Sequence, residues 1–154
     1  MMLVTQKKQY ALRAIFELAK QKGDQPMKSS AIAEAQSIPL RFLEVILGQL
    51  KRAGIVSSKR GFFGGYRLIQ PPDQICVGDI FRLLDREDGR QANVPCSSKG
   101  SCPFRGNCVF LQVWSQAEQA MNSVYERTTI QTLIDQEVRQ ADRNSLLFGP
   151  APAD

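Results

Sequence analysis

Two short helical segments followed by a glycine-bearing hairpin constrain the fold of this chain more than any other feature. Apolar residues recur at helical spacing over residues 29–35 and again over residues 40–52, and Pro39 is compatible with the first turn of the second segment. Two β-favouring runs, residues 55–59 and 66–69, follow directly and flank a glycine-containing turn. A helix-turn-helix followed by such a hairpin predicts a mainly α winged helix-turn-helix with a two-stranded β wing.

Further helices are expected on both sides of this unit. The apolar spacing predicts one helix over residues 7–20 and a shorter one over residues 77–84. Ser29 and Ser30 are expected to cap the first helix of the helix-turn-helix. We therefore expect residues 1–87 to form the winged helix-turn-helix DNA-binding region.

A long apolar stripe characterises the segment after the last cysteine. Its members recur at alternating intervals of three and four residues, as in a coiled coil, so the helix is expected to pair with its copy in a homodimer; packing on its own domain is the alternative. Thr128 and Gln131 have the spacing of a capping box and open a last helix. Residues 109–143 are thus expected to be dimerisation helices, and residues 144–154 a disordered tail. The stripe comprises Phe110, Val113, Ala117, Ala120 and Val124, and the last helix is expected to bury Ile130, Leu133, Ile134 and Val138.

Three cysteines with five residues between successive members lie in a segment rich in glycine, proline and serine, residues 88–108. Structural zinc sites usually draw on closely spaced cysteine pairs, which Cys96, Cys102 and Cys108 do not form. An iron–sulfur cluster tolerates wider loops, and a thiol switch that forms disulfides is a further alternative. The spacing favours the cluster over the switch and the zinc site. The fourth cysteine, Cys76, is expected to be a buried core residue.

Composition narrows the function classes. A chain of 154 residues can bury a core without disulfides, and neither a signal peptide nor a membrane span is expected, so we expect a cytoplasmic protein. The chain has no histidine, which excludes Cys-His and Ser-His catalysis, and we do not expect an enzyme. Residues 1–70 hold twelve Lys/Arg and four Asp/Glu, whereas residues 71–154 hold eight and eleven. The basic half suggests a polyanion partner.

The second helix of the helix-turn-helix is the expected major-groove reader. Leu40, Arg41 and Glu44 lie on its exposed side, where side chains of the first turns reach base edges. Lys59 and Arg60 belong to the wing, and Arg60 is placed to enter the adjacent minor groove. The alternative interpretation is that these residues form a solvated charged surface.

The chain resembles the winged-helix transcription regulators typified by the iron–sulfur regulator IscR and the nitric-oxide sensor NsrR. The resemblance extends from QYALRAIFELA through FLEVILGQLKRAGIVSSKRGFFGGYRL and VGDIFRLLD to the C-x(5)-C-x(5)-C segment. It implies a homodimer crossed by the long helix, with a cluster held by Cys96, Cys102 and Cys108 near the interface. It also implies DNA contacts from the recognition helix and the wing, here Arg41, Glu44 and Arg60.

The chain departs from the family pattern at the fourth cluster ligand. IscR-like members carry a histidine where this chain has Leu111, and NsrR-like members use an acidic residue where it has Gln9. We predict Gln9 of the partner subunit as a weak fourth ligand. Arg13 is expected to orient that ligand or to balance the charge of the cluster. A [2Fe–2S] cluster is expected in preference to a [4Fe–4S] cluster. The other candidates are Cys76, Asp85, Glu87 and Asp88.

These features together predict a homodimeric DNA-binding transcriptional regulator of a palindromic operator. Its operator binding is expected to depend on an iron–sulfur cluster that senses iron–sulfur status, oxygen, nitric oxide or redox state. A metal-free thiol/disulfide redox-switch transcription factor is the alternative within the same class. An iron–sulfur electron carrier is the alternative from another class, and it leaves the basic half unexplained.

Overall fold

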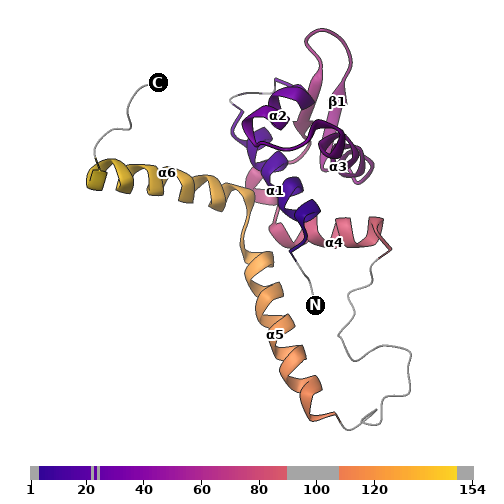
Figure 1. Ribbon diagram of the computed structural model, residues 1–154, viewed down its shortest axis with the longest axis vertical. Helices are drawn as coiled ribbons and strands as arrows, with labels where there is room; N and C mark the ends of the chain where they lie inside the picture. Colours follow the sequence, from indigo (N-terminus) through magenta and orange to yellow (C-terminus); the bar gives the residue numbers. More distant parts are fainter. Residues whose placement is uncertain (1–3, 22, 24, 90–107, 149–154) are drawn as a thin grey trace.

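The computed structural model describes residues 4–21, 23, 25–89 and 108–148, with side chains described as far as residue 143. Within these ranges the chain is mainly helical, with a single antiparallel hairpin (Figure 1). The predicted fold class is confirmed. The elements are α1 (Gln6–Ala19), α2 (Ser29–Ala35), α3 (Leu40–Arg52), β1 (Val56–Lys59), β2 (Gly65–Leu68), the short 3-10 helix η1 (Pro72–Gln74), α4 (Val77–Glu87), α5 (Val109–Arg127) and α6 (Ile130–Phe148).

One apolar core joins α1, α2, α3, β1, α4 and the start of α6. Each helix contributes residues three or four apart, because that spacing places side chains on one face of an α-helix. Within α3, for example, Leu43, Ile46, Leu47 and Leu50 are all fully buried. The core therefore fixes the position of α3 against its neighbours.

The turn of the helix-turn-helix places Ser37 in the left-handed region, with φ of 50°. Pro39 precedes α3, and its carbonyl accepts hydrogen bonds from the backbone N–H groups of Phe42 and Leu43, both at 3.0 Å. The expected serine cap of α2 is wrong, because Lys28 occupies the cap position and makes no side-chain cap bond. Ser29 and Ser30 are the first two residues of the helix itself, so neither lies at the cap position.

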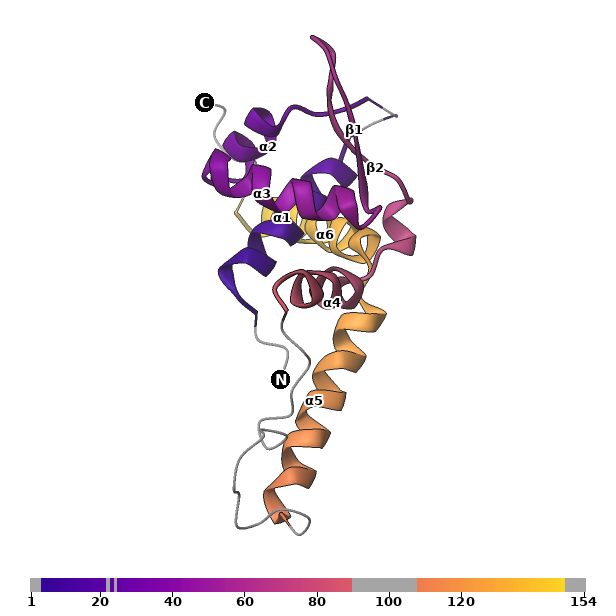
Figure 2. The ribbon, with the colours of Figure 1, turned by 90° about the vertical axis from the view of Figure 1, so that its right-hand side faces the viewer.

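The wing extends away from the helical body (Figure 2). Its strands pair from Val56 opposite Leu68 to Lys59 opposite Gly65. Met27 extends this sheet by an isolated antiparallel bridge to Tyr66. The backbone N–H of each residue donates to the carbonyl of the other at 2.8 Å. A Cβ on Gly65 would lie 2.4 Å from the Met27 carbonyl oxygen, so a glycine is required for this close approach.

Helix α5 points away from the winged body in both views (Figures 1 and 2), and none of its residues is buried. It is anchored to α4 near its C-terminal end, where Tyr125 packs edge-on against Phe81, with ring centroids 5.0 Å apart. An ion pair of 2.7 Å between Arg82 and Glu126 reinforces this contact. No helix within the described ranges has both the length and the apolar character needed to cross a bilayer.

Helix α6 returns to the winged body and packs on α1 and η1. Ile130 is fully buried, as predicted, but Val138 is exposed and was wrongly expected to point inward. The cap also differs: Thr129 accepts from the N–H of Thr132 at 3.1 Å, whereas the hydroxyl of Thr128 bonds back to Val124. The helix continues to Phe148. The expected disordered tail therefore begins at least five residues too early, and residues 149–154 lie outside the described ranges.

Candidate nucleic-acid interface and cysteine site

Helix α3 presents one polar and partly apolar face to solvent. The predicted groove-contacting residues Leu40, Arg41 and Glu44 are all exposed, because the opposite face of the helix is committed to the core. Phe42 and Val45 are exposed as well, and Phe42 packs edge-on against Tyr10 of α1, with centroids 5.8 Å apart. The first two turns of α3 are therefore accessible to a partner as large as a DNA duplex.

The wing carries the predicted cations Lys59 and Arg60, both of them exposed. Between them and β2 lies a tight turn closed by a 2.9 Å hydrogen bond from the Gly64 N–H to the Gly61 carbonyl. Phe62 and Phe63 occupy the two central positions of this turn and are 79% and 82% exposed. The sequence interpretation overlooked this pair, although aromatic residues are uncommon at positions that glycine, proline, asparagine and aspartate usually fill.

The structure describes one member of the predicted cysteine triad. Cys108 occupies the N-cap of α5, is half-buried and carries a free thiol. Cys96 and Cys102 lie outside the described residues. Within the part of the chain that the structure describes, no three potential metal-binding side chains gather at one place. The donor chemistry of the triad itself, three soft sulfur ligands, suits iron–sulfur ligation.

Cys76 is half-buried at the N-cap of α4 rather than a full core residue. Its thiol donates a 2.8 Å hydrogen bond to the Asp79 carboxylate. Burial and this bond raise the pKa of Cys76, while the bond from Cys76 and the neighbouring Arg82 lower the pKa of Asp79. A cysteine held as a neutral thiol is a poor nucleophile and a poor metal ligand.

Position also separates Cys76 from the triad. Cys76 forms a β-bridge with Thr129, just beyond the C-terminal end of α5, whereas Cys108 lies at the N-terminal end of the same helix. A helix of 19 residues is roughly 28 Å long at 1.5 Å per residue. Cys76 and Cys108 of one chain therefore cannot bind the same cluster.

The predicted fourth-ligand residues on α1 face solvent. Gln9 and Arg13 are both exposed and lie one helical turn apart. The Arg13 guanidinium reaches the Gln36 carbonyl at 3.5 Å, at the edge of hydrogen-bonding distance. Leu111, where the resemblance expects a histidine, is exposed in the first turn of α5. Whether Gln9 meets the triad stays a prediction.

Three carboxylates at the end of α4, also considered as ligands, are each engaged by a cation. Lys8 binds Asp85 at 2.8 Å, and Lys7 binds Asp88. Arg52, the last residue of α3, binds Glu87 at 2.7 Å. We call these three ion pairs the α4 clasp. It ties the last turn of α4 to both α1 and the recognition helix, and it engages the three carboxylates with cations of the chain itself.

Lys8 is the residue of the clasp that sequence reasoning missed. Its side chain is buried, and its ammonium lies 5.1 Å from the centroid of the Phe81 ring. The signal was available in the spacing: Lys8 precedes Ala11 and Ile15 by three and seven positions, so it shares the buried face of α1.

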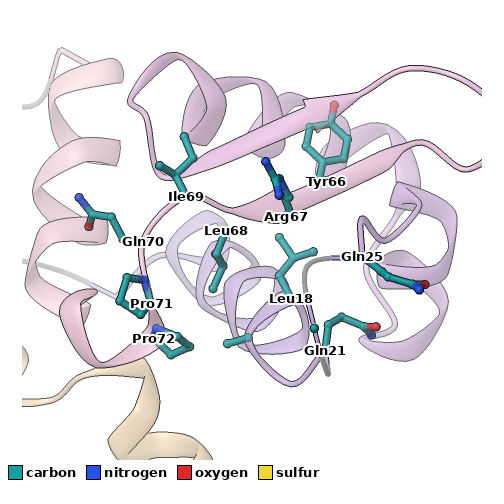
Figure 3. Close-up of a pocket in the computed structure, with 12 residues that line it drawn as sticks. Leu18, Gln21, Gln25, Tyr66, Arg67, Leu68, Ile69, Gln70, Pro71 and Pro72 are labelled. Atoms are coloured by element: carbon teal, nitrogen blue, oxygen red, sulfur yellow. The ribbon is translucent and has the colours of Figure 1, made fainter.

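A hollow lies between the end of α1 and strand β2 (Figure 3). Leu18, Leu68 and Pro72 contribute apolar surface, and Arg67 is the one charged side chain among its described lining residues. Arg67 donates through Nε to the Ser57 hydroxyl at 3.2 Å. The described lining holds no carboxylate and no thiol.

Comparison with known proteins places these features in context. The profile of the Rrf2 family, described as an iron-dependent transcriptional regulator, matches residues 4–136. An HTH-type transcriptional regulator of Neisseria meningitidis serogroup A is 35% identical over 137 residues, which cover 88% of this chain and 90% of that protein.

Two solved structures share the fold at similar identity. The structure of IscR from T. potens aligns with a TM-score of 0.70 and 30% identity, covering 88% of each chain. That of CymR, described as the global cysteine regulator of B. subtilis, aligns with a TM-score of 0.68 and 28% identity, covering 88% of this chain and 98% of CymR.

Proposed function

Because this chain belongs to the Rrf2 family of transcriptional regulators, we propose that it binds a palindromic operator as a homodimer and that an iron–sulfur cluster controls this binding. Membership of the family implies transcription regulation and DNA binding. It also agrees with the expectation that the chain is not an enzyme. The observation that carries the control by a cluster is the α4 clasp. It joins the recognition helix to the last turn before the cysteine-bearing segment.

The DNA contacts come from two exposed places. Arg41 and Glu44 of α3 read base edges in the major groove, and Leu40 adds an apolar contact. Lys59 neutralises phosphate, and Arg60 enters the neighbouring minor groove. A regulator that makes these contacts would act on chromosomal DNA, and hence in the cytoplasm.

Cys96, Cys102 and Cys108 would hold the cluster, with Gln9 of the partner subunit as a weak fourth ligand and Arg13 beside it to orient that ligand. A neutral amide oxygen binds iron weakly, so this corner of the site is the easiest to lose. When bound, the cluster supplies redox and ligand-exchange chemistry that responds to iron, oxygen or nitric oxide. We favour a [2Fe–2S] centre.

The clasp provides the route from the cysteines to the DNA. Binding of a cluster by the triad would act on α4 from its C-terminal end, where Lys7 and Lys8 of α1 bind Asp88 and Asp85. Arg52 then transmits a shift of α4 to the end of α3, because Glu87 is its ion-pair partner. Two recognition helices must sit about one DNA turn, roughly 34 Å, apart, so a small change in their relation alters operator affinity.

Spectroscopy of anaerobically purified protein tests the cluster. We expect visible absorbance and acid-labile sulfide in the wild type, and their loss in Cys102→Ala. Cys76→Ala is the matched control and keeps both, because Cys76 lies at the far end of α5 from Cys108. A Gln9→Ala variant is expected to retain iron but alter the visible spectrum. Colourless wild-type protein, or equal loss in both cysteine variants, would contradict the assignment.

A second candidate is a metal-free thiol switch on the same DNA-binding fold, because the three cysteines could also form disulfides and one solved CymR structure, from Staphylococcus aureus, is described as an oxidized form. In that case the protein is colourless in every preparation. Oxidation would then link cysteines of the triad in a disulfide and change operator affinity, and reduction would reverse the change. Mass spectrometry of the oxidised protein identifies the linked cysteines and so distinguishes the two candidates.

A further inference from the structure

The tip of the wing exposes a pair of aromatic residues that have no role in the DNA contacts proposed above. Phe62 and Phe63 pack edge-on against each other, with ring centroids 5.1 Å apart. They are the most exposed large apolar side chains of the described chain, although a soluble fold normally covers such groups. A function that needs them exposed is therefore indicated.

The turn that carries the pair is narrow and tightly built. Gly61 and Gly64 bracket the two rings, and a hydrogen bond of 2.9 Å closes the turn between them. A Cβ on Gly64 would lie 2.3 Å from the Lys59 carbonyl oxygen, so the backbone tolerates no side chain there. The turn itself therefore carries no side chain at the two positions that flank the rings, which suits entry into a groove only about 6 Å wide.

The surroundings of the pair are cationic. Lys59 and Arg60 precede the turn, and the Lys28 ammonium, at the start of α2, lies 5.0 Å from the centroid of the Phe62 ring. Lys28, Lys59, Phe62 and Phe63 also line one hollow beside the wing. Apolar rings rimmed by cations fit a partner that combines dense negative charge with flat apolar surfaces, which describes stacked bases between phosphates.

We propose that Phe62 and Phe63 form a wedge that enters the minor groove of the operator and partly unstacks a base step. This inference rests on the proposed DNA binding and adds to it a site and a source of specificity. Unstacking is easiest at flexible pyrimidine–purine steps, so the wing selects a TA or CA step without hydrogen bonds to its bases. The wedge bends the DNA, by about 20° or more in such complexes.

The test uses the full-length protein and a short duplex that the wild type enriches from a random-sequence pool. A 2-aminopurine base replaces the adenine of the step that lies under the wing, and its fluorescence reports unstacking. We expect the fluorescence to rise on binding of the wild type. The double variant F62S/F63S should abolish the rise, straighten the DNA and weaken binding on the order of ten- to a hundredfold.

Two control variants make the result specific. Ile69→Ser removes another exposed apolar side chain from the same hairpin and should leave fluorescence and affinity unchanged. F62L/F63L keeps an apolar wedge and should retain most of the bend. Circular dichroism verifies that each variant is folded.

The outcomes are distinct. If F62S/F63S binds, bends and unstacks the duplex like the wild type, the wedge is overturned while the proposed DNA binding stands. The same conclusion holds if the double variant loses self-association but keeps DNA binding, because the rings would then join copies of the protein. If the wild type enriches no duplex at all, both proposals fail.

Discussion

At the scale of single residues, Lys8 shows how the body of the regulator is held together. Its side chain is only 4% exposed, and its charge is met by Asp85 and by the face of Phe81. A buried ammonium is costly unless it is paired, so removing either partner leaves an unsatisfied group. Lys8 therefore contributes to stability by satisfying Asp85 at the end of α4.

We expect Lys8→Met to lower the free energy of unfolding by about 1–3 kcal/mol, since it removes one partner of a largely buried pair. Lys20→Met is the matched control. Lys20 is 36% exposed and pairs with Glu137 at 3.3 Å, so its loss should cost about 0.5 kcal/mol or less. Urea unfolding followed by circular dichroism gives both values, and equal losses would show that the burial of Lys8 has no special role.

Single residues also show what the sequence could not predict. The exposure of Arg41, Glu44 and Arg60 followed from helical and hairpin spacing and is confirmed. Cys76 was expected in the core, but its position at a helix cap beside Asp79 leaves it half-buried. Such partners come from tertiary packing, which spacing along one segment does not report.

At the scale of elements, α5 stands out because none of its residues is buried within its own chain. Its apolar stripe faces away from α4, and Phe110, Val113 and Val124 are each more than half exposed. Helices with such a stripe are stabilised by burying it against a partner. The geometry supports the proposal that α5 forms the dimer interface.

Val113→Glu is expected to convert the proposed dimer to a monomer, because it places a charge within the apolar stripe. Val113 is 57% exposed within the chain, so the fold of the subunit should survive. Gln119→Glu adds the same charge elsewhere on α5 and should leave the dimer intact. Sedimentation equilibrium measures the mass, and a Val113→Glu protein with the wild-type mass would rule out this interface.

The elements themselves were largely predictable. The helix-turn-helix and the hairpin were placed within one or two residues, because period and turn chemistry mark them locally. Ile130 of α6 is buried as expected and completes the core of the winged body, whereas the dimerisation role of residues 109–143 stays a prediction. The cap moved from Thr128 to Thr129 because both threonines suit a helix start, and packing selects between them.

At the scale of the whole molecule, the basic winged helix-turn-helix precedes the cysteine-bearing segment. The α4 clasp lies at the end of the winged unit, next to that segment. The clasp links residues distant in sequence, such as Arg52 with Glu87, so it could not be read from any local pattern. Control of DNA binding by the cluster requires that the cluster-bound and cluster-free forms position the DNA-binding unit differently. Its strength is measurable as a ratio of operator affinities.

That ratio is the most direct test of the central claim. The affinity of the full-length protein for its selected duplex is measured at one salt concentration, first with the cluster and then after its removal by anaerobic chelation. The proposed function predicts affinities that differ by about 5- to 150-fold between the two forms. Equal affinities would contradict control by a cluster, even for a protein that binds both DNA and iron.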